Sequence, residues 1–351
     1  MASGQDVIFE DVVNVSQQCP SLKRLDGSAI LITGASGMLA SYMVHSVLWL
    51  NRFVFQNPCT IFAAGRDFRK LVEKYGYALD FPYFHLLVGN TVKDFAEKCR
   101  EVEFIVHAAS PASPNAYIAD PIGTIRCNST MVDQLLEWGY EIGIKGFLYF
   151  SSGAVYGDTG PGEVPTPETF IGRIDPLGER SCYVESKRCG ETICFNYWKF
   201  SQMPTKVVRP AHTYGPGVNL DDSRVFASFL RNGLQGQAIE VKGDGKAKRT
   251  FCYLADANVA FWKVLLDGAD GEVYNVGNDQ AEITIMEFAQ IVAHFFEVEV
   301  KVKGEREPGL PGIREVAHRR LLDIGKLKGL GFCPRYGVEE GLQRVILSLR
   351  S

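Results

Sequence analysis

A glycine-rich turn between two apolar segments constrains the fold of this chain more than any other feature of its sequence. Residues 28–33 form a short apolar run rich in β-formers, and residues 38–55 are apolar over a helical length. Gly34 and Gly37 stand between them, separated by Ala-Ser. This order predicts a strand, a tight turn and a helix.

Further apolar runs of strand length follow, and segments long enough for crossover helices separate them. In one such segment, residues 123–142, apolar side chains recur at helical spacing. The runs cover residues 60–64, 84–88, 104–108, 146–151 and 205–208. Strands that alternate with helices imply a parallel sheet covered on both faces. We therefore predict an α/β fold with a doubly wound parallel sheet of the Rossmann type.

The texture of the sequence changes after Pro210, where glycine, proline and charged residues become denser and the apolar runs shorten. Two helices are still predicted there, because Asp256 is a candidate cap and Thr284 opens a capping box, each before an apolar run. The predicted divisions are a first domain over 1–209 that includes an N-terminal extension over 1–27, and a smaller mixed α/β substrate lobe over 210–351.

Composition and charge exclude several classes of protein. The 37 basic and 41 acidic residues give a net charge of −4, which does not predict nucleic acid or a membrane surface as a partner. The nine cysteines are scattered singly, and no His/Cys/Asp/Glu grouping has metal-ligand spacing, so we predict neither a disulfide framework nor a metal. The N-terminus carries acids where a secretory signal would be basic, so we predict a cytoplasmic protein.

The glycine turn also predicts a binding site for a dinucleotide. A turn of this kind lets the backbone approach a pyrophosphate at the start of a helix. Gly34 permits the turn, Gly37 the close approach, and the small Ala40 the packing of the helix. An ordinary turn between a strand and a helix is the alternative interpretation.

The residues after the second and third strands bear on the choice between NAD and NADP. Asp67 could accept a hydrogen bond from the ribose 2′-hydroxyl of NAD, whereas Arg66 could meet the 2′-phosphate of NADP. A solvated Arg-Asp pair is the alternative. Asn90 could bind the adenine amino group or only cap the next helix. These residues alone leave NAD and NADP both open.

Three residues in order after the glycine turn predict oxidoreductase chemistry. Tyr183 and Lys187 lie four apart on a predicted helix, which places both on one face. An ammonium beside a phenol favours the phenolate, which can take a proton from a hydroxyl while a hydride leaves the same carbon. Ser152 follows the fifth strand, at the edge where parallel sheets bind ligands.

The motifs together resemble the extended short-chain dehydrogenase/reductases, the group of nucleotide-sugar epimerases, dehydratases and decarboxylases. The similarity runs over nearly the whole length. Its motifs are Thr33-Gly34-x-x-Gly37, His107-Ala-Ala-Ser110, Ser152-x-x-Val155-Tyr156-Gly157, Tyr183-x-x-x-Lys187, Arg209-Pro210, Tyr214-Gly215-Pro216, Arg249-Thr-Phe251 and Tyr274-Asn-Val-Gly277-Asn278. Within the group, the segments 107–114, 182–192 and 222–225 are most similar to UDP-glucuronate decarboxylases.

The resemblance implies a set of binding residues and a homodimer. A nucleotide-sugar substrate, such as a UDP-sugar, would contact Ser110, Ser152, His212, Arg224 and Arg249. His212 stands where many relatives carry asparagine, and a packed histidine with no special task is the alternative for it. The resemblance favours NAD as the cofactor and leaves NADP open. The cofactor would contact Gly34, Ser36, Gly37, Met38, Leu39, Arg66, Asp67, Asn90, Ala108, Ala109, Ser110, Tyr183 and Lys187.

One departure from the family pattern affects the predicted reaction. In the 4,6-dehydratases the similar motif carries an Asp-Glu pair at the two positions that Gly153 and Ala154 occupy here. The decarboxylases usually carry a glutamate just before Val-Tyr-Gly, at the position of Ala154. Removal of water needs an acid–base couple, whereas oxidation and re-reduction at C4 needs only the serine, tyrosine and lysine. We therefore favour epimerisation of a UDP-hexose or UDP-hexuronate, with decarboxylation of UDP-glucuronate, 4,6-dehydration and a non-catalytic dinucleotide sensor as alternatives.

Overall fold

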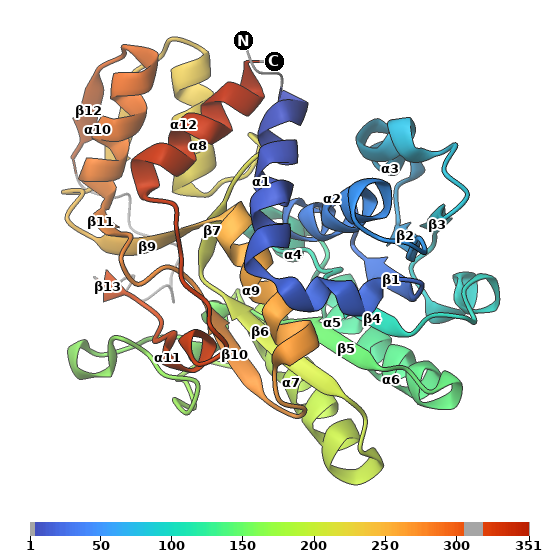
Figure 1. Cartoon of the computed structure of the whole chain (residues 1–351). Helices are drawn as coiled ribbons and strands as arrows, with labels where there is room; N and C mark the ends of the chain where they lie inside the picture. Colours follow the sequence, from blue (N-terminus) through green and yellow to red (C-terminus); the bar gives the residue numbers. More distant parts are fainter. Residues whose placement is uncertain (1–3, 305–318, 351) are drawn as a thin grey trace.

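A seven-stranded parallel sheet forms the centre of the computed structural model, which describes residues 4–304 and 319–350 (Figure 1). The strand order is β10-β6-β5-β4-β1-β2-β3. The strands are β1 (Ala29–Thr33), β2 (Thr60–Gly65), β3 (Phe84–Val88), β4 (Phe104–His107), β5 (Gly146–Phe150), β6 (Thr205–Pro210) and β10 (Val273–Val276). The predicted α/β fold with a parallel Rossmann sheet is confirmed.

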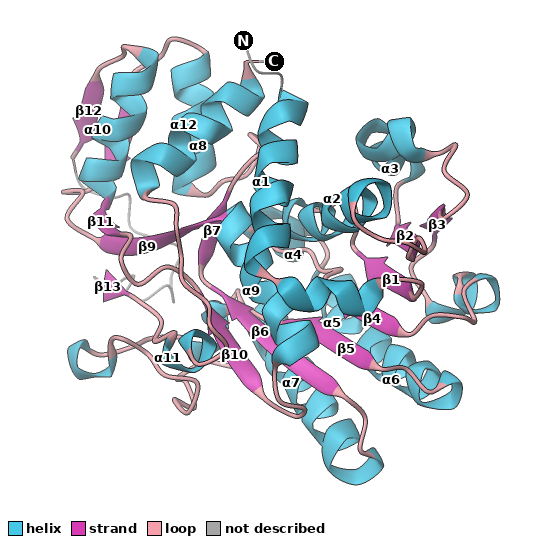
Figure 2. Ribbon diagram, in the orientation of Figure 1, coloured by secondary structure: helices cyan, strands magenta, loops and turns pink. Residues whose placement is uncertain are grey.

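Helices cover both faces of this sheet (Figure 2). One face carries α1 (Gly4–Gln18), α2 (Met38–Phe53) and α9 (Leu254–Asp267), and the other carries α5 (Pro121–Asn128), α6 (Thr130–Ile142) and α7 (Ser181–Ser201). Successive side chains of a strand point to opposite faces. Ile30 and Ile32 therefore join the first core cluster, and Leu31 between them joins the second. Burial on both faces explains the unbroken apolar runs that predicted the strands.

The structure corrects two predicted helices. The segment 123–142 is two helices, because α5 ends and α6 begins around Ser129, whose hydroxyl donates to the Ile125 carbonyl at 2.6 Å. Such a bond competes with regular helical bonding. Asp256 is not a cap: α9 begins at Leu254, and the buried carboxylate accepts backbone hydrogen bonds from the distant Arg335 and Tyr336.

The remaining short helices lie at the ends of the strands. They are α3 (Phe68–Tyr75), α4 (Pro114–Ala119), α11 (Gly325–Lys328) and the 3₁₀ helices η1 (Pro20–Leu25), η2 (Gly76–Ala78), η3 (Val92–Asp94), η4 (Ala96–Lys98), η5 (Gly153–Tyr156) and η6 (Pro161–Glu163).

The second lobe is built around a small mixed sheet. Strand β9 (Lys248–Tyr253) pairs with β7 (His212–Tyr214), β11 (Glu282–Thr284) and β13 (Arg319–Arg320). A separate pair joins β8 (Ile239–Lys242) to β12 (Val300–Lys303). The helices of this lobe are α8 (Val225–Leu234), α10 (Ile285–Phe296) and α12 (Val338–Leu349). The predicted capping box of Thr284 and Glu287 is confirmed at the start of α10.

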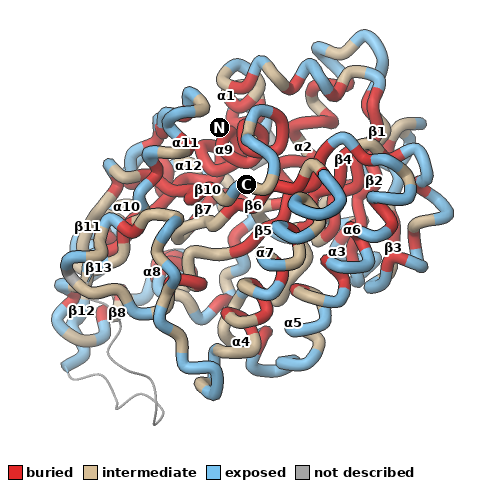
Figure 3. Tube along the Cα trace, turned by 90° about the horizontal axis from the view of Figure 1, so that it is seen from below, coloured by how far each residue is buried: buried red, intermediate tan, exposed pale blue. Residues whose placement is uncertain are grey.

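The chain returns to the central sheet after entering the second lobe. Helix α9 packs on β5 and β6, and β10 pairs with β6 at the edge of the sheet. Helix α1 lies against α2, α9 and α12. Helix α9 and strand β10, which fall in the predicted division 210–351, therefore lie against strands that begin in the division 1–209. Figure 3 shows the buried residues along the sheet and along the helix faces that cover it. In the described residues, no helix has both the length and the apolar character needed to cross a membrane.

Candidate active site

The glycine turn connects the carboxyl end of β1 to the start of α2. Gly34 has φ +69°, and a Cβ atom at this position would lie 2.7 Å from the Ala109 backbone. Only glycine fits such a conformation and approach. Gly37 precedes α2 and supplies no side-chain cap. The backbone amides of Met38 and Leu39 are the first of α2, and no side chain caps them. Uncapped amides at the start of a helix can bind an anion.

The residues predicted near the adenosine lie at the ends of the next two strands. One carboxylate oxygen of Asp67 accepts backbone hydrogen bonds from Arg69 and Lys70 and so caps α3. Arg66 is exposed beside it. Asn90 is exposed and does not cap the following η3 helix, since Thr91 and Asp94 form that capping box.

The end of β4 closes the other side of the turn. Ala108 and Ala109 lie against Gly34, and the Cys127 thiol donates to the Ala109 carbonyl at 3.1 Å. The Ser110 hydroxyl is 3.5 Å from the Pro111 carbonyl. Buried His107 of β4 contacts the Thr33 hydroxyl through Nδ1 at 2.8 Å. These contacts fix the carboxyl ends of β1 and β4 against each other.

Ser152, Tyr183 and Lys187 meet at the carboxyl end of β5. Ser152 begins η5, and its hydroxyl accepts from the Ala154 amide at 3.1 Å and forms a hydrogen bond with Tyr183. Tyr183 and Lys187 lie one turn apart on α7, and both are buried. Lys187 Nζ lies 5.9 Å from the centre of the Tyr183 ring and donates to the Phe150 carbonyl at 2.5 Å. The three predicted catalytic residues are therefore neighbours in the fold.

Burial opposes charge on both members of the Tyr183–Lys187 pair. It raises the pKa of Tyr183, while the hydrogen bond from Ser152 and the cations Arg224 and Arg180 lower that pKa. Burial also lowers the pKa of Lys187 to about 8. The spacing alone predicted that the lysine lowers the pKa of the phenol. In the structure, burial is the largest influence on that pKa.

The predicted substrate residues of the second lobe converge on His212. Burial lowers the pKa of His212 to about 3, and the nearby cations Arg320, Arg249, Arg224 and Arg180 lower it further, so the imidazole is neutral. Arg224 is paired with Asp222 through a 2.6 Å contact. Arg249 is buried on β9, in register with Arg320 of β13.

Two members of this arginine group were not predicted from the sequence. Arg320 reaches the site because β13 pairs with β9, a contact between segments 70 residues apart that carries no local signal. Its Nε is buried and has no hydrogen-bond partner among the described residues. Arg180 precedes Tyr183 by three residues, so helical spacing could have indicated it. Four guanidinium groups thus act electrostatically on one neutral imidazole, in a cationic part of the fold suited to an anionic ligand.

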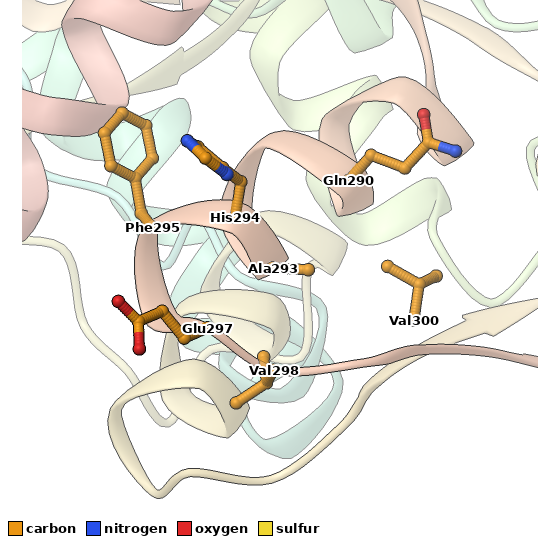
Figure 4. A pocket seen from close by; sticks show the side chains of 7 residues that line it. All are labelled: Gln290, Ala293, His294, Phe295, Glu297, Val298 and Val300. Atoms are coloured by element: carbon orange, nitrogen blue, oxygen red, sulfur yellow. The ribbon is translucent and has the colours of Figure 1, made fainter.

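A surface pocket lies elsewhere, at the end of α10. It has a volume of about 550 Å³ and contains none of the predicted site residues (Figure 4). Its lining is formed by Gln290, Ala293, His294, Phe295, Glu297, Val298 and Val300.

Comparison with known proteins identifies the family. The model of the NAD dependent epimerase/dehydratase family matches residues 30–277. The chain belongs to this family. The resemblance drawn from the motifs is confirmed, and the chain is an NAD-dependent enzyme of the extended short-chain dehydrogenase/reductases that modify nucleotide sugars.

Two curated relatives are similar to this chain over most of its length. UDP-glucuronic acid decarboxylase 3 of Arabidopsis thaliana is 32% identical over 315 residues, which cover 89% of this chain and 86% of the relative. UDP-glucuronic acid decarboxylase 1 of Danio rerio is 32% identical over 346 residues, which cover 97% and 78%.

Two solved structures share the fold of this family member. An epimerase of Methanothermobacter thermautotrophicus superimposes with a TM-score of 0.80 at 19% identity and covers 95% of this chain and 96% of its own. The UDP-glucuronic acid 4-epimerase of Bacillus cereus, solved with UDP-glucuronic acid and NAD, gives a TM-score of 0.76 at 19% identity and covers 92% and 99%. At these identities the likeness establishes the fold.

Proposed function

We propose that this enzyme oxidises C4 of a UDP-linked hexuronate with bound NAD and then releases the carboxyl group as carbon dioxide. The observation that carries the proposal is the group of four guanidinium ions around His212, two of which, Arg180 and Arg224, also influence Tyr183. The relatives named UDP-glucuronic acid decarboxylases support the same chemistry.

The residues of the first lobe fit a dinucleotide. The Gly34 turn, whose approach to Ala109 excludes a side chain, and the uncapped start of α2 would hold the pyrophosphate. When bound, NAD supplies a hydride acceptor for C4 and returns the hydride later. NADP stays open, since Arg66 is exposed beside Asp67, one of whose carboxylate oxygens is engaged as the cap of α3.

The first step needs a base at the sugar C4 hydroxyl. Tyr183 would accept the hydroxyl proton as the C4 hydrogen departs as hydride, leaving a 4-keto sugar. Ser152, bonded to Tyr183, would orient the reacting oxygen. Lys187 would hold a positive charge beside the ring, from a position 5.9 Å from the ring centre.

The charge of the site favours an acidic sugar over a neutral one. The diphosphate of a nucleotide sugar carries about two negative charges near neutral pH, because each phosphate is esterified and keeps one strongly acidic oxygen. Of the four arginines, Arg224 is already paired with Asp222. Arg180 and Arg320 add positive charge near His212, which the carboxylate of a uronate would balance. The two cations that also influence Tyr183 suit a carboxylate attached close to C4.

Loss of carbon dioxide then needs little further help from the protein. Oxidation of C4 turns the uronate into a β-keto acid, in which the electrons of the C5–C6 bond move toward the C4 carbonyl as the carboxyl group departs. Ala154 packs with Tyr117, Tyr183 and Val184 and offers no acid for the dehydratase reaction. We therefore rank decarboxylation above the epimerisation that the motifs alone favoured, and 4,6-dehydration below both.

The test is to incubate the enzyme and NAD with UDP-glucuronate labelled at the carboxyl carbon. We expect labelled carbon dioxide at turnover rates, together with a UDP-pentose or its 4-keto form in the mass spectrum. UDP-galacturonate without carbon dioxide would show an epimerase instead. Turnover of UDP-glucose but of no uronate would overturn the proposed acidic substrate. A homodimer and a cytoplasmic location stay predictions.

A further inference from the structure

A second tyrosine lies against Tyr183. Tyr117 of α4 is 1% exposed, and its ring stacks on the Tyr183 ring with the centres 5.1 Å apart and the planes 16° from parallel. The Tyr117 hydroxyl accepts a hydrogen bond of 3.0 Å from Nε of Arg180. Its carbonyl accepts a weaker bond from the Cys182 thiol at 3.7 Å. Tyr117 is thus held at the start of α7 by two hydrogen bonds, one from Arg180 and one from Cys182.

We propose that Tyr117 and Arg180 are a positioning pair for Tyr183, in which the stacked ring fixes the plane of the phenol and the anchored guanidinium favours its ionised form. The inference rests on the proposed function, in which Tyr183 is the base. Neither residue needs to touch the reacting atoms for this role.

The stack explains how the Tyr183 ring keeps one orientation. Aromatic rings that lie offset and nearly parallel attract each other beyond their burial. Tyr117, Tyr183 and Val184 form a small cluster of buried residues, against which Ala154 and Ile174 also pack. The ring of Tyr183 is therefore enclosed, while its hydroxyl meets Ser152. A base held this way needs no reorientation when a substrate hydroxyl arrives.

The hydrogen bond explains how an exposed cation keeps its place. Arg180 is exposed, and a free arginine side chain has many conformations. The bond from Nε to the Tyr117 hydroxyl restricts the guanidinium to the side of α7 that carries Tyr183. A nearby positive charge stabilises a phenolate, whereas the Tyr117 phenol opposes its ionisation. Of the two, the Tyr117 phenol has the larger influence on the pKa of Tyr183, and the anchored arginine offsets part of it.

Other groups face Tyr183 and set the background for this effect. Ser152 and the cation Arg224 lower its pKa, and burial, the largest influence, raises it. The titratable and charged neighbours, taken over all elements packed against the ring, are Tyr117 of α4, Tyr149 of β5, Arg180 and Lys187 of the α7 segment, and Arg224 before α8.

The test measures the ionisation of Tyr183 in the NAD-bound protein and the pH dependence of kcat. Phenolate absorbance in the near ultraviolet is titrated with Tyr183→Phe as the baseline. We expect R180Q to move the midpoint to higher pH by about half to one unit, which lowers the phenolate fraction below it about three- to tenfold. Y117F removes the larger, opposing influence and should move the midpoint to lower pH. R180K, which keeps the charge, should retain most of the original midpoint. R188Q, which removes a half-buried cation of the same helix, is the matched control and should not move it.

The double variant Y117F/R180Q separates a coupled pair from two independent residues. Because Tyr117 holds Arg180 in place, R180Q should change the midpoint less in the Y117F background than in the wild type. An unchanged midpoint in R180Q, or shifts that add, would overturn the inference, and a loss of kcat without a shift would reduce both residues to structural support. The absorbance titration does not depend on sugar turnover, so failure of the proposed reaction is recognised separately.

Discussion

At the scale of single residues, burial and not the neighbouring lysine dominates the chemistry of the site. The spacing of Tyr183 and Lys187 predicts an ammonium that lowers the pKa of the phenol. In the structure, burial raises the pKa of Tyr183 and lowers the pKa of Lys187 to about 8, because a low-dielectric surrounding penalises both charges. Ser152, Arg224 and Arg180 offset part of this penalty for the phenol.

The substitution Tyr183→Phe tests the role of the phenol directly. It keeps the ring that stacks on Tyr117 and removes the group that would accept the proton. We expect kcat for UDP-glucuronate to fall by about 10² to 10⁴-fold, the usual contribution of a general base. Circular dichroism and thermal unfolding should stay close to those of the wild type. Activity within a few-fold of wild type would show that another group takes the proton.

The substitution Gly34→Ala tests the cofactor turn. A Cβ atom at Gly34 would approach the Ala109 backbone to 2.7 Å in a conformation that alanine rarely adopts. We expect NAD affinity measured by calorimetry to fall at least tenfold, and the free energy of unfolding to fall by about 1–3 kcal/mol. The control is Gly143→Ala, which has φ +70° at the end of α6 but no atom within 4 Å of its Cβ position. It should cost stability and leave NAD binding unchanged.

At the scale of elements, the strands were predictable because they are buried on both faces, whereas helix boundaries depended on distant partners. Strand β1, which is buried at every residue, covers Ala29–Thr33 of the predicted run 28–33. Asp256 looked like a helix cap in the sequence, yet it lies inside α9 and accepts backbone hydrogen bonds from Arg335 and Tyr336, 79 and 80 residues away. Its second carboxylate oxygen is buried with no partner among the described residues. The carboxylate joins α9 to the segment that leads into α12.

This buried carboxylate predicts a dependence of stability on pH. Burial raises the pKa of Asp256 from 3.8 to about 6. Between these values the unfolded chain is ionised while the folded chain still holds the proton, so stability falls as pH rises through this window and is constant above it. Urea unfolding measures the free energy of unfolding across this pH window. In Asp256→Asn we expect it to fall by less than in the wild type, the difference being on the order of 2–3 kcal/mol.

The matched control for this titration is an exposed aspartate. Asp80→Asn alters a carboxylate on the surface of the first lobe and should leave the pH dependence as in the wild type. Some fall should persist in Asp256→Asn, because burial also raises the pKa of Asp11 to about 6. An unaltered slope in Asp256→Asn would contradict the assignment.

At the scale of the whole molecule, the N-terminal helix joins the two lobes. Asp11 of α1 is 0% exposed and accepts hydrogen bonds from the hydroxyls of Tyr42 on α2 and Tyr253 on β9, at 3.0 and 2.6 Å. Arg344 of α12 donates to its other oxygen at 2.9 Å. One carboxylate thus contacts three elements from both lobes, so the segment that the sequence suggested as an extension is part of the core.

The substitution Asp11→Ala tests this connection. It leaves two buried hydroxyls and a guanidinium without their acceptor, which should lower the free energy of unfolding by about 2–5 kcal/mol. Urea unfolding followed by fluorescence and circular dichroism measures the loss. The control is Glu10→Ala, whose carboxylate contacts the same Arg344 at 3.1 Å but is 61% exposed, and which should cost less than about 1 kcal/mol. Equal losses in the two variants would show that the buried contact adds nothing.

The sequence by itself determined the parts of this protein whose signals are local. Fully buried strands read as apolar runs, Gly34 marks a conformation open only to glycine, and a spacing of four places Tyr183 and Lys187 on one helix face. Only the tertiary structure decided which distant groups surround them. Arg320 reaches His212 because β13 pairs with β9, and Tyr117 reaches Tyr183 because α4 packs against α7. Such contacts depend on the packing of whole elements, which no local pattern of residues records.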